Sequence, residues 1–266
     1  MVEGFTFKEK YTVEDLRAIM TILRRPDGCP WDREQTHESI RRDLIEETYE
    51  VIEAINKGSA EMLAEELGDL LMQVVFHAEI EREKGVFDFD DVADGICKKL
   101  ILRHPHVFGE VTVSGTDEVL KNWDAIKMAT KRQKTATEAI ESIPRELPAL
   151  MRAEKVQKKA AKVGFDWPDV SGAFQKICEE TAEVKTALAD KDPAACKEEL
   201  GDLLFAVVNV CRFAGVDAEE ALTAATDKFS SRFSHVEKRA GESGRKMEDY
   251  TLEELDRFWE EAKHRS

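Results

Sequence analysis

The sequence is poor in the residues that end short strands and in those that build disulfide frameworks. Its 266 residues include 14 glycines and 7 prolines, which favours long helices over many short strands. The 5 cysteines are odd in number, widely spaced and never arranged as C-x-x-C, so neither a disulfide framework nor a zinc site is expected. No stretch of about 18 apolar residues occurs, and the N-terminus has no apolar run of the signal-peptide type. We therefore expect an all-α, soluble, cytoplasmic protein with no membrane partner.

Positive charge is also scarce. The chain has 55 Asp and Glu against 39 Lys and Arg, and its formal net charge is -16 at pH 7. Such an excess of negative charge repels phosphate backbones on average, which argues against a nucleic-acid partner. A small nucleotide can still bind an acidic protein when a divalent cation lies between the two negative partners.

What the chain does contain is an internal repeat. Residues 44–55 (LIEETYEVIEAI) resemble residues 177–188 (ICEETAEVKTAL), and residues 66–76 (ELGDLLMQVVF) resemble residues 199–209 (ELGDLLFAVVN). Both pairs have the same offset, because 179 − 46 and 199 − 66 are each 133. Equal spacing of two blocks in two halves indicates a tandem duplication.

The repeat defines a domain organisation. Apolar residues recur at helical spacing around both blocks, and no convincing alternating strand pattern is present. The sequence predicts two tandem helical-bundle domains, residues 1–130 and residues 149–266. A polar stretch with two prolines, residues 131–148, is predicted to link them.

Each repeat carries E-E-x-x-E followed by E-x-x-D. Residues three or four apart share one face of a helix, so a helical hairpin would bring four carboxylates to one point. The four candidates in the first repeat are Glu47, Glu50, Glu66 and Asp69, and in the second repeat Glu180, Glu183, Glu199 and Asp202. Because Asp69 and Asp202 lie among apolar neighbours, we expect both to be partly buried and to need a partner.

A cation would remove the repulsion within such a cluster. Mg²⁺ prefers oxygen ligands and couples carboxylates to phosphates, and Mn²⁺ would accept the same ligands. Neither pattern contains the histidine of di-iron bundles, and His104 and His106 are interpreted as a loop feature. A solvated acidic face would explain one E-E-x-x-E, but the preserved spacing in two diverged halves favours a metal site in each.

The duplicated blocks, together with Gly28–Asp32 (GCPWD) and His104–Phe108 (HPHVF), resemble the MazG family of bacterial nucleoside triphosphate pyrophosphohydrolases. The resemblance extends from about Thr12 to Lys263. It implies an all-α fold similar to that of dimeric dUTPases. It also implies that two copies of the chain assemble into a homodimer. It also implies Mg²⁺-dependent hydrolysis of NTPs and dNTPs, with broad base tolerance, to a nucleoside monophosphate and pyrophosphate. The C-terminal copy is expected to carry the main activity.

The resemblance also assigns roles to residues of the second repeat. Its four carboxylates match the family's metal ligands. Trp259 matches an aromatic position near the base, where it could stack on any base, or else be a core or dimer-contact residue. The residues at or near phosphate-binding positions are Lys176, Lys197, Lys228 and Arg232. For Lys228 and Arg232, one helical turn apart, the alternative is a solvated helix face.

The remaining acid of the second cluster, Glu179, is the one least needed as a ligand. We therefore predict that it is the general base for a water that attacks the α-phosphorus. The position equivalent to Lys176 in the first repeat is Asp43, so metal binding is expected in both halves and turnover mainly in the second. Two other functions stay open: a dNTP house-cleaning hydrolase of narrow specificity with the same fold, and a non-catalytic metal-binding regulatory module.

Overall fold

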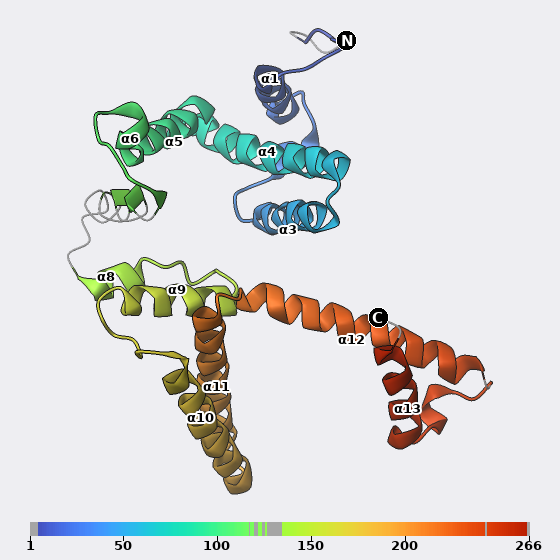
Figure 1. Ribbon diagram of the computed structural model, residues 1–266. Coiled ribbons are helices and arrows are strands. Elements are labelled where there is room, and N and C mark those ends of the chain that lie inside the picture. The colour runs from blue at the N-terminus through green and yellow to red at the C-terminus, as the bar shows by residue number, and fades with distance from the viewer. Residues whose placement is uncertain are drawn as a thin grey trace. The chain divides into compact units, whose positions relative to one another are not determined.

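The computed structural model describes residues 5–116, 118–119, 122–123, 126, 135–242 and 244–264. Every regular element in these ranges is helical, as the sequence predicts (Figure 1). None of the helices described is long and apolar enough to span a membrane. Backbone contacts divide the chain into unit 1, Met1–Lys127, and unit 2, Met128–Ser266.

Unit 1 is built around a helical hairpin that carries the first carboxylate block. The helices of unit 1 whose bounds are described are α1 (Val13–Arg24), α2 (Pro30–Glu34), α3 (Arg41–Lys57), α4 (Ala60–Glu83), α5 (Phe89–Arg103) and α6 (Pro105–Phe108). Gly58 ends α3 in the left-handed conformation, with φ 62°, and Ser59 caps α4 by accepting a hydrogen bond from the amide of Met62. Helices α3 and α4 pack against each other along this tight turn.

The apolar core of unit 1 lies where α1 and the C-terminal half of α4 meet. Its buried members are Met20, Ile40, Val75, Phe76 and Ile80. These residues leave the N-terminal half of α4, with its acidic side chains, outside the core. The hairpin is thus anchored at one end and presents its carboxylates at the other.

A buried arginine holds the loop that contains the GCPWD motif. The Arg24 guanidinium forms two hydrogen bonds with the Glu83 carboxylate, of 2.8 and 2.9 Å, and donates to the carbonyl oxygens of Asp32 and Gln35. A Cβ on Gly28 would lie 2.4 Å from the carbonyl oxygen of Ile22, so only glycine fits this close approach. Packing against the end of α1 therefore explains Gly28 and Asp32 of the motif.

Replacing Gly28 by alanine is expected to lower the free energy of unfolding by about 1–3 kcal/mol, because the added methyl group meets rigid backbone rather than a flexible side chain. Urea unfolding followed by circular dichroism measures the change. The matched control is Gly95→Ala, in the exposed face of α5, where a Cβ has open space. Helix propensity predicts that this control is stabilised by about 0.5–1 kcal/mol. Equal stability of the two variants would contradict the packing explanation.

Unit 2 repeats the hairpin. Its described elements are α8 (Ala136–Glu141), α9 (Ala149–Ala161), α10 (Val170–Asp190), α11 (Pro193–Ala214), α12 (Ala218–Glu242), η1 (Met247–Asp249) and α13 (Leu252–Lys263). Helix α8 lies within the stretch predicted as a linker, buries Ala139 and packs against α9. The part of that stretch from residue 136 onward thus contributes to unit 2, whereas residues 131–134 lie outside the described residues.

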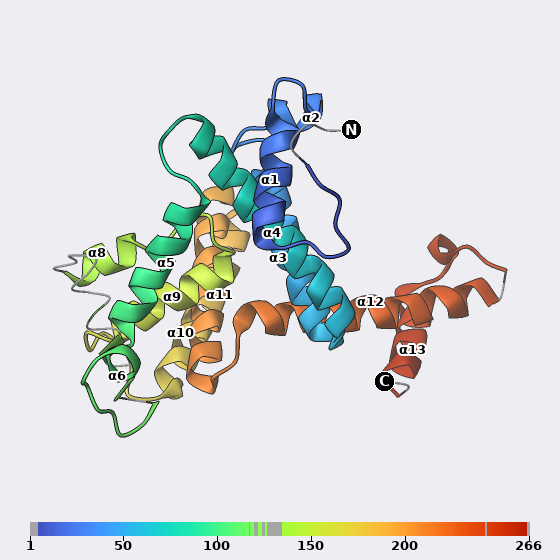
Figure 2. The same ribbon diagram turned by 90° about the horizontal axis from the view of Figure 1, so that it is seen from above.

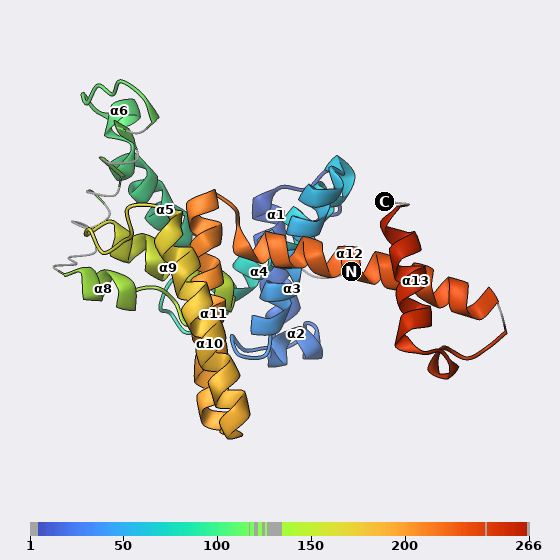
Figure 3. The same cartoon turned by 60° about the horizontal axis from the view of Figure 1, so that its bottom comes forward.

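Helices α10 and α11 run side by side along most of their length (Figure 3). Lys191 ends α10 in the left-handed conformation, and the Asp192 side chain accepts hydrogen bonds from the amides of Ala194 and Ala195. Pro193 occupies the first position of α11, where its fixed φ suits a helix start and no amide hydrogen bond is lost. The second carboxylate block therefore sits on a hairpin of the same construction as the first.

Helix α12 continues from the end of α11 and leads away from the hairpin, and α13 packs against its distal part (Figure 2). Side chains cap the N-termini of both helices. Asp217 accepts hydrogen bonds from the amides of Glu219 and Glu220, and Thr251 and Glu254 form a reciprocal capping box. This arrangement places α13 apart from α10 and α11 within unit 2.

Candidate metal centres

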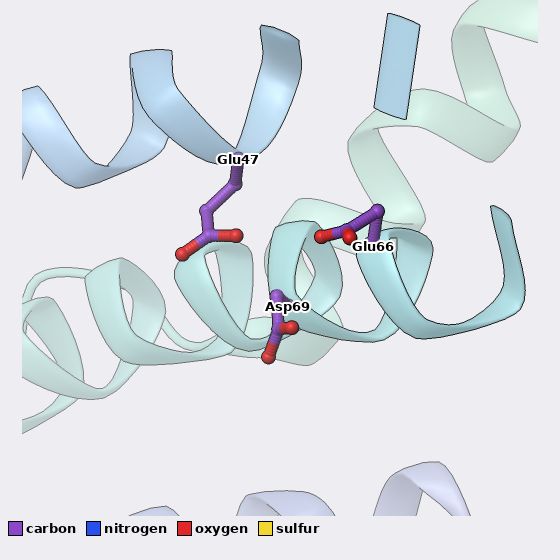
Figure 4. Close-up of side chains that lie close together, drawn as sticks. All are labelled: Glu47, Glu66 and Asp69. Atoms are coloured by element: carbon purple, nitrogen blue, oxygen red, sulfur yellow. The ribbon is translucent and has the colours of Figure 1, made fainter. Parts of the chain in front are cut away.

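The first cluster consists of Glu47 from α3 and of Glu66 and Asp69 from α4. One carboxylate oxygen of each lies within 4.8 Å of the others, and all three residues are half-buried. Figure 4 shows Glu47 projecting from its helix toward the part of α4 that carries Glu66 and Asp69. The fourth predicted ligand, Glu50, is exposed and lies outside this close group.

The charges of the first cluster act on one another. Burial raises the pKa of Glu47, and the nearby carboxylates of Asp69 and Glu50 raise it further. Burial likewise raises the pKa of Glu66, with Glu50 as the next cause. Glu50 is thus close enough to belong to the same electrostatic group, and a cation placed there would reverse both shifts.

The second cluster is organised around Glu180, whose exposed fraction is only 2%. Glu180 belongs to two close carboxylate groups at once, one with Glu179 and Glu183 on its own helix and one with Glu199 and Asp202 on α11. The oxygens in each group lie within 4.8 Å of one another. Burial raises the pKa of Glu183, and a hydrogen bond with Glu180 adds to the rise. All four predicted ligands of this repeat are brought together.

Glu180 is buried because it lies on a line of buried residues along α10. The buried residues of α10 are Ala173, Glu180 and Ala187, spaced seven apart, which is two helical turns. In the first repeat, the same line contains the buried Ile40 and Ala54 on either side of Glu47. An acid placed seven residues from an apolar residue on either side could therefore have identified Glu180 in the sequence as the buried, central member of the cluster.

The expectation that both aspartates are partly buried is right for Asp69 and wrong for Asp202. Asp69 is half-buried, whereas Asp202 is exposed. The two repeats differ at the next apolar position: Leu204 is 56% exposed, whereas its counterpart Leu71 packs against the buried core of unit 1. Apolar neighbours in the sequence therefore do not ensure that an acidic side chain is buried within one chain.

The predicted phosphate-binding residue Lys176 contacts acids in the structure. Its ammonium nitrogen lies 2.9 Å from Glu179 and also forms an ion pair with Glu180. The hydrogen bonds with Glu180 and Glu179 raise the pKa of Lys176 well above its ordinary value. Lys197 is exposed on α11, two residues before Glu199.

The other predicted substrate residues gather on α12 and α13. The Arg232 guanidinium lies 5.7 Å from the centre of the Trp259 ring, and the Phe229 ring lies 5.1 Å from it. Lys228 is exposed one turn before Arg232. Among the described residues, no hydrogen bond or ion pair joins this group to the second carboxylate cluster. One chain therefore brings Arg232 to Trp259, but neither of them to Glu180.

The donor chemistry of both clusters suits a hard divalent cation. Every side chain in the close groups found among the described residues offers carboxylate oxygen, with no imidazole or thiolate. Oxygen-only sites of this kind fit Mg²⁺ or Mn²⁺ better than zinc or iron. The net negative charge of each cluster is also the property that a cation would compensate.

Two helical hairpins, each with a carboxylate cluster at the same positions, define a duplicated all-α protein with two candidate metal centres. Residues 35–108 and 171–237 match the family model described as the MazG nucleotide pyrophosphohydrolase domain. The chain belongs to the MazG family, as its sequence motifs predict.

Similar proteins match nearly the whole chain. A Thermotoga maritima protein named nucleoside triphosphate pyrophosphohydrolase/pyrophosphatase MazG is 48% identical over 250 residues, which cover 94% of this chain and 95% of that protein. The Escherichia coli nucleoside triphosphate pyrophosphohydrolase is 45% identical over 254 residues, or 94% and 97% of the two chains. A Mycobacterium tuberculosis protein of the same name is 43% identical over 153 residues, 57% of this chain and 45% of that protein. The similarity to the first two proteins thus includes both repeats.

Proposed function

We propose that this protein hydrolyses nucleoside triphosphates, both NTPs and dNTPs and with broad base tolerance, to a nucleoside monophosphate and pyrophosphate. The reaction takes place at the second cluster and depends on Mg²⁺, for which Mn²⁺ can substitute. The observation that carries the proposal is the nearly complete burial of Glu180 at the point shared by two carboxylate groups. The names of the similar proteins support the same reaction class.

The four carboxylates of the second cluster would hold the cation, which when bound would offset the charge of the triphosphate and of the leaving pyrophosphate. Glu179 is 58% exposed and lies beside the cluster, so it can accept the proton of the attacking water. The water oxygen bonds to the α-phosphorus while the bond to the α–β bridging oxygen breaks, and pyrophosphate leaves with that electron pair. Lys176, on the same helix, can turn from Glu179 and Glu180 to a phosphate oxygen.

The protein acts as a homodimer in this proposal. Helix α3 exposes a stripe of large apolar residues at spacings of three or four, and α11 exposes a second group. The members of the two groups are Ile45, Tyr49, Ile52 and Ile55 on α3, and Leu200, Leu204, Phe205 and Val207 on α11. Exposed apolar surfaces of this kind favour association with another protein. Because most soluble oligomers are symmetric assemblies of one chain, we propose that the partner is a second copy.

A second copy would also complete the site. Lys228, Arg232 and Trp259 are proposed to bind the phosphates and the base, yet none of their described contacts within one chain reaches the second cluster. In a two-fold dimer, α12 and α13 of one protomer can approach the α10–α11 hairpin of its partner. We therefore assign the basic and aromatic residues of each site to the opposite protomer.

Unit 1 is proposed to bind the cation without turnover. Among the described residues, no lysine or arginine forms an ion pair with Glu47, Glu66 or Asp69, and the position equivalent to Lys176 is Asp43. The first cluster therefore has ligands for a cation but no phosphate-binding lysine on its helix. The non-catalytic metal-binding function that the sequence left open is thus proposed for unit 1 alone.

Product analysis tests the proposed reaction. The purified protein incubated with ATP and Mg²⁺ is expected to release AMP and pyrophosphate, because attack at the α-phosphorus breaks the α–β anhydride bond. Chelation of the metal is expected to stop the release. ADP and phosphate as the products would contradict the proposal, and a turnover confined to one of the eight common NTPs and dNTPs would instead favour the narrow-specificity hydrolase.

A further inference from the structure

The two carboxylate clusters differ in whether a cation of the protein already occupies them. In the second cluster, the ammonium of Lys176 is paired with Glu180 and Glu179. In the first cluster, the equivalent helix position is Asp43, and the adjacent Arg42 forms an ion pair with Glu46 at 2.8 Å. Glu46 corresponds to Glu179 and is not one of the close group. The first cluster is thus without an internal counter-charge in the described part of the chain.

The pairing in the second cluster competes with a metal ion. Glu180 is buried, so its charge in the metal-free protein is balanced mainly by Lys176. A divalent cation bound to the same carboxylate would lie within a few ångströms of the ammonium, and two positive charges at that separation repel each other. The ammonium must therefore leave Glu180 before or while the cation binds there.

Lys176 is able to leave. Its side chain is 40% exposed and ends a flexible four-carbon stem, so the head group can move without disturbing α10. The phosphates of a nucleotide would offer the ammonium new charge-assisted hydrogen bonds. A bound nucleotide would therefore remove the competitor, and by linkage the metal and the nucleotide would strengthen each other's binding at this cluster.

We propose that Lys176 competes with the divalent cation for Glu180, so that the second cluster loads its metal together with the nucleotide. The first cluster, in contrast, binds the cation on its own. The inference rests on the proposed metal site. It adds that metal binding at the second cluster is coupled to nucleotide binding, which the site alone does not require. It also gives Lys176 two successive partners, Glu180 in the metal-free protein and phosphate in the complex.

The test is calorimetric titration of Mn²⁺ into the metal-free protein without nucleotide. The first cluster is silenced by Glu66→Gln and Asp69→Asn in every sample, so that only the second cluster binds. Lys176→Met is expected to raise the affinity for Mn²⁺ about fivefold to tenfold, the effect of removing one charged hydrogen bond from a ligand. The matched control is Lys185→Met, an exposed lysine on the same helix, which is expected to leave the affinity unchanged.

An unchanged or lower affinity in Lys176→Met would overturn the inference. Absence of Mn²⁺ binding in all three proteins would instead contradict the proposed metal site, so the two failures are distinguishable. If Lys176→Met does not fold, the reciprocal variant decides. Asp43→Lys, with the second cluster silenced by Glu199→Gln and Asp202→Asn, is expected to weaken Mn²⁺ binding at the first cluster about fivefold. An affinity equal to that of the Asp43 parent would overturn the inference.

Discussion

Replacing Glu180 by glutamine is expected to lower kcat for ATP hydrolysis by about a hundredfold to a thousandfold, the effect of losing one preorganised electrostatic contact in an active site. Glutamine keeps the size of the side chain and its ability to accept a hydrogen bond, but it removes the charge. Because Glu180 is the member common to both carboxylate groups, its loss weakens the cation's attachment to α10 and to α11 together. The measurement is steady-state release of pyrophosphate at saturating Mg²⁺.

The matched control is Glu47→Gln, the equivalent change in the first repeat. It is expected to change kcat by less than about threefold, because the first cluster is proposed to bind a cation without turnover. The far-ultraviolet circular dichroism spectra of both variants should match that of the parent protein. ATP hydrolysis at the parent rate in Glu180→Gln would contradict the placement of the site. A large loss in Glu47→Gln would show that the first repeat also turns over substrate.

Much of the fold was predictable from the sequence because its signals are local. The caps at Ser59, Asp192 and Thr251, the proline at the start of α11 and the left-handed glycine at the end of α3 each act within one turn of a helix. The identical spacing of the two blocks then predicted two hairpins. The helix α8 was missed because six residues give too short a window for helical periodicity, and its stability comes from packing on α9.

The candidate site was predictable in its ligands but not in their surroundings. Spacing of three and four along a helix, with a hairpin between the two motifs, predicted the close carboxylate groups of both repeats, although Glu50 lies outside the first of them. The burial of Glu180 and the exposure of Asp202 depend on which side chains of the facing helix cover them, and that is a tertiary property. The pairing of Lys176 with Glu180 rather than with solvent was likewise invisible, since i and i+4 on a helix permits the contact without requiring it.

A heterodimer made from one Glu180→Gln chain and one Arg232→Ala chain is expected to recover about half of the parent activity, although each variant alone is nearly inactive. If the carboxylates of one protomer work with Arg232 of its partner, the heterodimer contains one site with both defects and one site with neither. The two chains carry different affinity tags and are purified together after coexpression. Pyrophosphate release per dimer is compared with that of the parent and of the two homodimers.

The control pairs Glu180→Gln with Lys185→Met, an exposed change on α10 that lies outside the α12–α13 group. That heterodimer should also show about half of the parent activity, because either arrangement leaves one site with both Glu180 and Arg232. The Glu180→Gln and Arg232→Ala pair separates the two arrangements, since an arrangement within one chain leaves both of its sites defective and the heterodimer inactive. The packing of Arg232 against Trp259 on α13 makes the shared arrangement the expected one, because it holds the guanidinium on the element that reaches away from its own hairpin. An inactive heterodimer beside an active control would therefore assign the complete site to a single chain.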